Sequence, residues 1–456
     1  MNAIRNYYDL LKQRAQLHPQ KQFLCLDETH WSYREALARA DAISASLPPG
    51  VAGDVLVLAE DFLDQASAFF ALQAGNVRPI LLHHGLSAGE LEDILRTNAL
   101  QGLLSVGKHG IEYRAATTPA RNHGEKDILG VLSSGSTGTP KVMYRTYESW
   151  AGFFPVQNEV FGVSGDTRLF LHGSLSFTGN LNSFLSVLYE GGTVVTSRKT
   201  RCRTWENLLR SEKANVIYLV PAKLRLLLDA LRQPVASVDS VFTGSQLLSE
   251  NLLKKMMVVF CSPRIILYYG ASELNYITYA VCDDPKRDPA NLGRPFPGIR
   301  VSVRDGLVYV DTPYHVSGVE IPFTVKDTGF LNEAGELIFQ GRREAWINKG
   351  GVKISMARIE KKLLELDGIK EAAILRHEDE KRGSDFAAFL VKESGAEEQA
   401  IRQSIRHHLN AVEIPSRIFF LDELPLNDRG KIDRRKLEGF ACHGIGLSVT
   451  ACENAP

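Results

Sequence analysis

The chain has 456 residues, too many for one ordinary hydrophobic core, so two or three domains are expected. Lys and Arg balance Asp and Glu at 53 each, so bulk charge gives no reason to expect nucleic acid or an anionic membrane as partner. The six cysteines form no Cys-x-x-Cys pair, and the first residues lack the apolar run of a signal peptide. We therefore expect a cytoplasmic protein with reduced thiols and no membrane-spanning segment.

Helices and strands alternate over the first 130 residues. Amphipathic helices are expected over residues 5–17, 33–47, 62–75 and 88–97, and apolar strands over 53–59, 78–82 and 127–132. This alternation predicts a largely parallel sheet covered by helices on both faces.

A loop rich in glycine and hydroxyl side chains follows the third of these strands. It contains Ser133, Ser134, Gly135, Ser136, Thr137 and Gly138, and Lys141 ends it. Glycines allow close approach of the backbone to a ligand, and consecutive N–H groups, hydroxyls and an ammonium suit a phosphate. A solvated Ser/Gly loop is the alternative. The loop differs from the P-loop of kinases, because Pro140 precedes Lys141 and Val142 replaces the metal-binding hydroxyl. A P-loop kinase is a further alternative, and it would form ADP as its product instead of AMP.

The stretch from Ser133 to Lys141 resembles the phosphate-binding signature of the adenylate-forming superfamily, which includes acyl- and aryl-CoA ligases, stand-alone adenylation domains and luciferases. The resemblance implies an α/β fold with a large N-terminal domain of stacked, mostly parallel sheets plus a β subdomain. A small, mobile α+β C-terminal domain would follow. It also implies ATP and Mg²⁺ as cofactors.

Strands and helices continue to alternate beyond the loop. A helix is expected over residues 148–158, and further strands over 167–171, 193–196, 215–220, 240–243 and 264–268. His172 follows the first of these strands and resembles the superfamily's pocket histidine. The resemblance implies a catalytic role for His172 near the acyl substrate and an acid pocket formed by His172, Ser176, Phe177 and Thr178. An ordinary histidine at a strand end is equally compatible. Residues 172–189 contain no Asp or Glu, so a substrate without an α-ammonium group is favoured.

A second motif follows the strand that ends near Tyr268. Tyr269, Gly270, Ser272 and Glu273 resemble the family's Tyr-Gly-x-Thr-Glu motif. The resemblance places Tyr269 against adenine, Ser272 near the α-phosphate and Glu273 on magnesium, which prefers carboxylate oxygens. Gly244 and Ser245 end another strand, where the family has a turn against the adenine edge.

Short apolar runs after residue 293 predict an antiparallel β subdomain with strands over 300–303, 307–310, 318–325 and 336–340. Asp327 lies 14 residues before Gly341, the family's separation between its ribose-binding aspartate and its Gly-Arg pair. By resemblance, Asp327 binds the ribose hydroxyls and Arg342 the ribose or phosphates. An exposed turn is the alternative for Asp327.

The sequence from about residue 343 to 440 predicts a compact α+β domain. We expect an N-terminal domain over residues 1–342, a small C-terminal domain over 343–440 and a disordered tail over 441–456. Resemblance makes Glu344 the hinge, Gly350 and Gly351 part of the thiol channel, and Lys431 the catalytic lysine. Met356 and Arg358 depart from the family pattern.

Together these motifs predict an AMP-forming acid–thiol ligase. An aryl or modest aliphatic acid would be converted to an acyl-adenylate and then to a thioester of coenzyme A. The phosphopantetheine of a carrier protein is an alternative acceptor, and a nucleotide-binding relative without catalysis is an alternative function.

Overall fold

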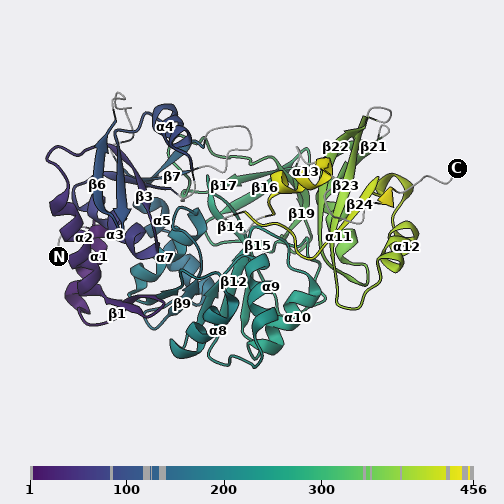
Figure 1. The fold of residues 1–456 in the computed structure, drawn as a ribbon, viewed down its shortest axis with the longest axis horizontal. Helices are drawn as coiled ribbons and strands as arrows, with labels where there is room; N and C mark the ends of the chain where they lie inside the picture. Colours follow the sequence, from purple (N-terminus) through teal and green to yellow (C-terminus); the bar gives the residue numbers. More distant parts are fainter. Residues whose placement is uncertain are drawn as a thin grey trace.

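The computed structural model describes residues 4–82, 86–116, 124, 126–132, 140–342, 346–349, 352–379, 383–427, 432–443 and 450–451. Two sheets in which parallel strands predominate form the large N-terminal part, and a smaller α+β part lies at the other end of the molecule (Figure 1). The predicted fold is confirmed. Within the described ranges, no helix has both the length and the apolar character needed to cross a membrane.

The larger sheet has nine strands among the described residues, in the order β15-β14-β13-β12-β11-β9-β10-β1-β2. Strands β1 and β9 to β13 run parallel, whereas β2, β14 and β15 are antiparallel to their neighbours. The strands are β1 (Gln22–Leu26), β2 (Thr29–Ser32), β9 (Arg168–Leu171), β10 (Thr193–Thr196), β11 (Val216–Tyr218), β12 (Ser240–Gly244), β13 (Arg264–Ala271), β14 (Asn275–Val281) and β15 (Arg294–Pro295).

The second sheet has the order β6-β5-β3-β4-β7-β8 in the described part of the chain. Its strands are β3 (Asp54–Ala59), β4 (Arg78–Leu82), β5 (Gly102–Gly107), β6 (Gly110–Ala115), β7 (Asp127–Leu132) and β8 (Val142–Thr146). The end of β7 leads into the glycine-rich loop, whose residues 133–139 lie outside the described residues.

Helix α3 contacts strands of both sheets, and residues 65–73 of it are buried without a break. This continuous burial follows because a helix between two sheets has no solvent face, and the polar residues Gln65, Ser67 and Gln73 of α3 are hydrogen-bonded within the protein. The helices of this part are α1 (Tyr7–Leu17), α2 (Tyr33–Ser46), α3 (Phe62–Ala74), α4 (Ala88–Thr97), α5 (Glu148–Ala151), α6 (Phe154–Phe161), α7 (Thr178–Glu190), α8 (Cys202–Ser211), α9 (Pro221–Ala230) and α10 (Glu250–Val259).

Two sequence predictions are wrong in this region. The single helix over 148–158 is two helices, α5 and α6, because Pro155 fits only the first turn of a helix and therefore starts a new one. The strand over 318–325 is absent, apart from one bridge between Phe323 and Val310. Pro322 cannot donate to a ladder, and Gly318 has a φ of 79°.

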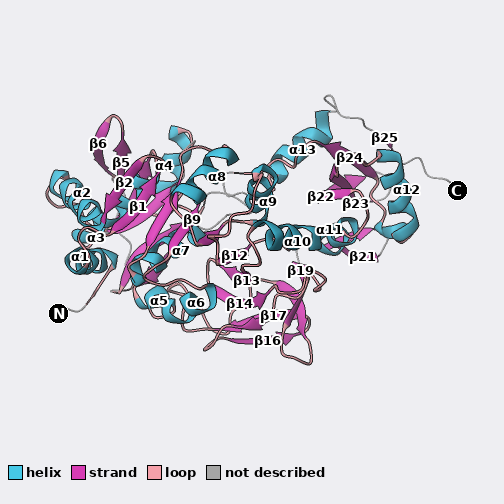
Figure 2. Cartoon of the chain, turned by 90° about the horizontal axis from the view of Figure 1, so that it is seen from below, coloured by secondary structure: helices cyan, strands magenta, loops and turns pink. Residues whose placement is uncertain are grey.

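The predicted antiparallel β subdomain lies below the larger sheet in Figure 2. It consists of β16 (Arg300–Arg304), β17 (Leu307–Asp311), β18 (Asp327–Leu331) and β19 (Leu337–Arg342). Asp327 and Arg342 pair in register across β18 and β19, so the two residues that the sequence associates lie opposite each other on the backbone.

The C-terminal part has a central β23 with hydrophobic clusters on both faces. Its elements are β20 (Trp346–Lys349), β21 (Val352–Ser355), α11 (Met356–Leu364), β22 (Ile369–Asp379), β23 (Gly383–Lys392), α12 (Glu398–His408), β24 (Arg417–Leu421), α13 (Arg434–His443) and β25 (Thr450–Ala451). The prediction of a disordered tail from residue 441 is wrong for two segments. Residues 441–443 end α13, and residues 450–451 pair with β24, whose edge offers unpaired backbone groups. The boundary at residue 343 adjoins residues outside the description and stays a prediction.

Side chains of the two parts contact one another through ion pairs. Arg225 of α9 binds Glu371 at 2.9 Å, and Asp229 of the same helix binds Lys370 at 2.6 Å. Lys361 of α11 binds Asp288 at 2.5 Å. Helix α9 therefore contacts the C-terminal part directly.

Candidate functional site

A cavity of about 490 Å³ opens at the carboxyl ends of β9, β11, β12 and β13. In parallel sheets this edge is where ligands bind, because the loops that follow the strands all meet there. Among the residues predicted from the sequence, the lining includes His172, Ser176, Phe177, Thr178, Ser245, Gly270, Ser272, Glu273 and Asp327. Residues from four strands and the β subdomain thus meet at one place.

Backbone strain is concentrated around this cavity. Ser245, Asn275 and Lys326 line it and adopt left-handed conformations, with φ of 70°, 72° and 65°. Such conformations are unfavourable for residues other than glycine and cluster at functional sites. Gly270 is needed for a different reason, because a β-carbon there would lie 2.6 Å from the carbonyl oxygen of Asn275.

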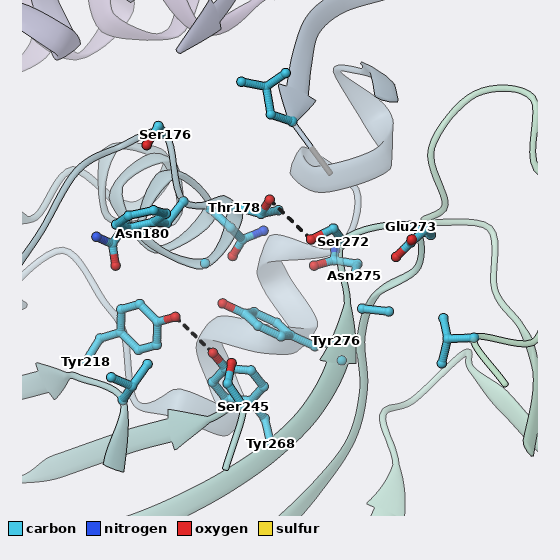
Figure 3. A pocket seen from close by; sticks show the side chains of 18 of the residues that line it. Ser176, Thr178, Asn180, Tyr218, Ser245, Tyr268, Ser272, Glu273, Asn275 and Tyr276 are labelled. Carbon is cyan, nitrogen blue, oxygen red and sulfur yellow. Dashed lines mark hydrogen bonds between the residues drawn. The ribbon is translucent and has the colours of Figure 1, made fainter. Parts of the chain in front are cut away.

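Ser272 and Glu273 line one side of the cavity (Figure 3). We group them with the lining residues Lys326 and Asp327 of the β subdomain and call this group the Glu273 side. The hydroxyl of Tyr269 donates to Oδ2 of Asp327 at 2.6 Å, which joins β13 to β18 and fixes the tyrosine ring. Asp327 is 2% exposed, so its carboxylate is held rigidly. This pair connects two of the predicted motifs, although Tyr269 itself does not line the cavity.

The opposite side comprises His172, Ser176, Asn180, Tyr218 and Lys223, and we call it the His172 side. Figure 3 shows Asn180 and Tyr218 across the cavity from Glu273. Ser272 donates to the hydroxyl of Thr178 at 3.4 Å, which bridges the strand β13 motif and the start of α7 (Figure 3). The two sides therefore meet at a pair of hydroxyl groups.

His172 is fixed and electrically neutral at ordinary pH. Burial lowers the pKa of His172 to about 3, and the Lys223 ammonium acts in the same direction. The imidazole packs against the ring of Trp205 at 4.4 Å between centroids, and its Nδ1 lies 3.4 Å from Nζ of Lys223. A neutral imidazole is a poor proton donor. The catalytic role of His172 stays a prediction, whereas the structure shows its contact with Lys223 directly.

Buried Arg145, which sequence reasoning missed, supports the Glu273 side. Its guanidinium donates to the carbonyl oxygens of Ser272 at 2.7 Å and Tyr314 at 3.1 Å. Burial lowers the pKa of Arg145 to about 9, while the Tyr7 hydroxyl and the Glu273 carboxylate act in the opposite direction. The side chain therefore remains a cation at neutral pH and fixes the backbone just before Glu273.

Gln65 and Lys223 were also missed. Gln65 of α3 is 3% exposed and binds the loop after His172, with its Oε1 accepting from the backbone N–H of Leu175 at 2.7 Å. Lys223 comes five residues after the end of β11, at the same sheet edge as His172. That position could have identified Lys223, whereas nothing local distinguishes Gln65 or Arg145.

The structure does not bring every predicted residue to the cavity. Tyr269, Gly244 and Lys141 are not among the described lining residues, and Lys141 is exposed just before β8. The side chain of Arg342 lies outside the description. Several predictions lie outside the described residues: Ser133, Ser134, Gly135, Ser136, Thr137, Gly138, Glu344, Gly350, Gly351 and Lys431.

A cavity at the carboxyl edge of a parallel sheet, with two carboxylates in its lining, is typical of ligand-binding sites in α/β enzymes. The family described as AMP-binding enzyme matches residues 112–319, and the AMP-binding enzyme C-terminal domain matches residues 358–431. The chain belongs to this family, the adenylate-forming superfamily that its motifs predict. The predicted class, an AMP-forming acid–thiol ligase, is thereby confirmed.

Three similar proteins illustrate the relationship. The uncharacterized acyl–CoA ligase YhfT of Bacillus subtilis is 29% identical over 324 residues, 67% of each chain. The 3,4-dihydroxybenzoate–[aryl-carrier protein] ligase of Bacillus anthracis is 27% identical over 316 residues, 69% of this chain and 74% of that protein. The structure of O-succinylbenzoate coenzyme A synthetase from Bacillus subtilis, in complex with ATP and magnesium, shares the fold. Its TM-score is 0.77 at 20% identity, over 94% of this chain and 99% of that one.

Proposed function

We propose that this protein converts a carboxylic acid, ATP and coenzyme A into an acyl-CoA thioester, AMP and pyrophosphate. The observation that supports this most is the two-sided cavity, in which the Glu273 side contains the family's nucleotide motifs and the His172 side is left for the acid. The hydroxyls of Thr178 and Ser272, where the sides meet, would lie beside the reacting carboxylate and α-phosphate.

The proposed nucleotide contacts follow from the Glu273 side. Asp327, oriented by Tyr269, would accept hydrogen bonds from the ribose hydroxyls, and Ser245 and Gly270 would approach the adenine. The loop of Ser133 to Gly138 and Lys141 would surround the phosphates, and Arg342 would add a charge beside Asp327. Consecutive backbone N–H groups favour such binding without requiring a lysine in the P-loop position.

A magnesium ion fits the Glu273 side, because the lining there offers the hard carboxylate oxygens that it prefers. Glu273 would hold the ion, which would screen the charge of the phosphates. The backbone on each side of this carboxylate is fixed, since Arg145 holds the carbonyl of Ser272 and Val316 donates its N–H to the carbonyl of Glu273.

In the first step a carboxylate oxygen attacks the α-phosphorus, forming the acyl–O–P bond as pyrophosphate leaves. In the second step the sulfur of coenzyme A attacks the acyl carbon, AMP leaves and the thiol proton passes to solvent. Lys431 would neutralise the negative charge that gathers in the first step. Preorganised charges of this kind are worth roughly 100- to 1000-fold in rate.

Residues 343–440 would form a lid that turns about Glu344 between the two steps and brings Gly350 and Gly351 to the thiol path. The cross-part ion pairs of Asp229 and Asp288 support this proposal, because partly exposed pairs are weak enough to exchange. Reaction partners would be a small acid and coenzyme A. The free cysteines Cys25, Cys202, Cys261 and Cys282 agree with a cytoplasmic location.

The test is product analysis with Mg·ATP, coenzyme A and a panel of aryl and aliphatic acids that includes 2-succinylbenzoate and 3,4-dihydroxybenzoate. We expect acid-dependent AMP and pyrophosphate and an acyl-CoA of the corresponding mass. ADP as product would contradict the proposal. If the adenylate forms but no acyl-CoA does, and a phosphopantetheine carrier protein becomes acylated, the carrier protein and not coenzyme A is the thiol acceptor. Binding of ATP without turnover of any acid would instead indicate a relative without catalysis.

A further inference from the structure

The His172 side of the cavity contains a lysine that no motif of the family accounts for. Nζ of Lys223 donates to the carbonyl oxygen of His172 at 3.1 Å and lies beside the neutral imidazole of that residue. The described acidic residues in the lining are Glu273 and Asp327, and Figure 3 shows Glu273 on the opposite side. The ammonium therefore gives the acid-binding side a local positive charge.

A second donor points to the same place as Lys223. A β-carbon on Gly173 would lie 3.1 Å from Nζ of Lys223 and 3.2 Å from Nδ2 of Asn180. Both nitrogens thus pack against the backbone of Gly173, which has a φ of 120°, and lie on the same side of the cavity. Nδ2 of Asn180 uses one hydrogen for the carbonyl of Ser174 at 2.9 Å, and an amide nitrogen has two.

The position of Lys223 on helix α9 strengthens its charge. Lys223 is the third residue of this helix, where the helix dipole is positive, and no side chain caps that end. A cation in the first turn is unfavourable for the helix itself but raises the positive potential at the cavity wall. Anions are stabilised at such a site.

We propose that the acid substrate bears a second carboxylate, which Lys223 and Asn180 bind while the first carboxylate reacts beside Thr178 and Ser272. This inference rests on the proposed function. Asn180 supplies a hydrogen bond to the oxygens of the second carboxylate, and Lys223 supplies the opposite charge. A neutral group in the same position would lack the charge-assisted hydrogen bond to the ammonium and would bind less tightly.

The test compares dicarboxylic acids with their monoamides, which have the same shape without the second charge. Aliphatic pairs of increasing length and the three benzene dicarboxylates with their carbamoyl counterparts form the panel. We expect the best diacid to exceed its monoamide in kcat/KM for AMP formation by roughly tenfold or more, as for a charge-assisted hydrogen bond. Equal rates, or a preference for the monoamide, would overturn the proposal.

Two variants of Lys223 test the assignment to this residue. Lys223→Met should abolish the preference for diacids, and Lys223→Glu should shift it toward acids that carry an amine at the far end. Glutamate suits the first turn of α9, so this variant should fold. Lys254→Met is the matched control, because Lys254 is exposed on α10 and pairs with Glu250. Equal losses for diacid and monoamide in Lys223→Met would indicate only a structural role and would contradict the proposal.

Calorimetric binding of the diacid in the presence of a non-hydrolysable ATP analogue separates this inference from the proposed function. Tighter binding of the diacid than of its monoamide, lost in Lys223→Met, would support the inference even if no AMP forms. Turnover of acids without any such preference would support the proposed function and overturn the inference.

Discussion

The two sides of the cavity differ in how they are encoded. On the Glu273 side, Ser272, Glu273 and Asp327 belong to motifs whose residues are adjacent or at fixed spacing in the sequence. On the His172 side, Lys223 and Asn180 come from separate helices and belong to no motif. Under the proposed function, the Glu273 side binds ATP and the His172 side binds the acid. Mutations on the two sides should therefore alter different kinetic constants.

The largest effect is expected for Lys431→Ala. Loss of the proposed charge at the α-phosphate should reduce the rate of adenylate formation roughly 100- to 1000-fold. Single-turnover measurement of AMP formation tests this, and the preference between a diacid and its monoamide should survive in the residual activity. A rate within threefold of the wild type would remove Lys431 from the chemical step.

Arg145→Met should affect the Glu273 side through its backbone. The substitution leaves the buried carbonyls of Ser272 and Tyr314 without their donor, so we expect a loss of about 2 kcal/mol in the free energy of unfolding and a higher KM for ATP. Urea denaturation and ATP titration measure both. Arg145→Lys keeps the charge but cannot span both carbonyls, so it should recover part of the stability. Unchanged stability in Arg145→Met would contradict this role.

Asp327→Asn should weaken ATP binding without altering the acid site. The amide retains an acceptor for Tyr269 but loses the charged acceptor for the ribose, and we expect KM for ATP to rise about tenfold. The KM for the acid should stay the same. A rise in the KM for the acid alone would show that the two sides are assigned the wrong way round.

Acidification should destabilise the His172 side. Because the pKa of His172 is lowered to about 3, the unfolded chain binds a proton between pH 6.5 and 3 that the folded chain excludes. Stability should therefore fall as pH decreases through that window, by up to about 1.4 kcal/mol per pH unit. Urea denaturation from pH 7 to pH 5 measures the slope, and His172→Gln should reduce it. An identical slope in the variant would mean that His172 is not buried in its neutral form.

Asp229→Asn should have the smallest effect. It removes the ion pair of α9 with Lys370 and the neighbouring contact with Lys255, both at 2.6 Å and partly exposed. Such pairs are worth about 0–1 kcal/mol, so the overall stability should hardly change. A change in the ratio of adenylate to thioester formation, measured in the two half-reactions, would show that these contacts bias the lid. An unchanged ratio would make them incidental.

Motifs and periodicity predicted the fold class and most of the Glu273 side, since Asp327 and Glu273 each belong to a stretch with its own local pattern. The same reasoning missed Arg145, Gln65 and Lys223, because each acts on residues about 50 to 130 positions away in the sequence. It also extended a helix through Pro155 and predicted a strand over 318–325, where local apolar character outweighed the effect of proline. Long-range pairing leaves no periodic signal.

The separation of the two sides is tested most directly by acid-dependent exchange of labelled pyrophosphate into ATP, measured for the wild type, Lys223→Met and Asp327→Asn. The half-saturating concentrations of ATP and of the preferred diacid are determined for each. The account predicts that Lys223→Met raises only the value for the diacid and that Asp327→Asn raises only the value for ATP. Both values rising together in both variants would contradict it.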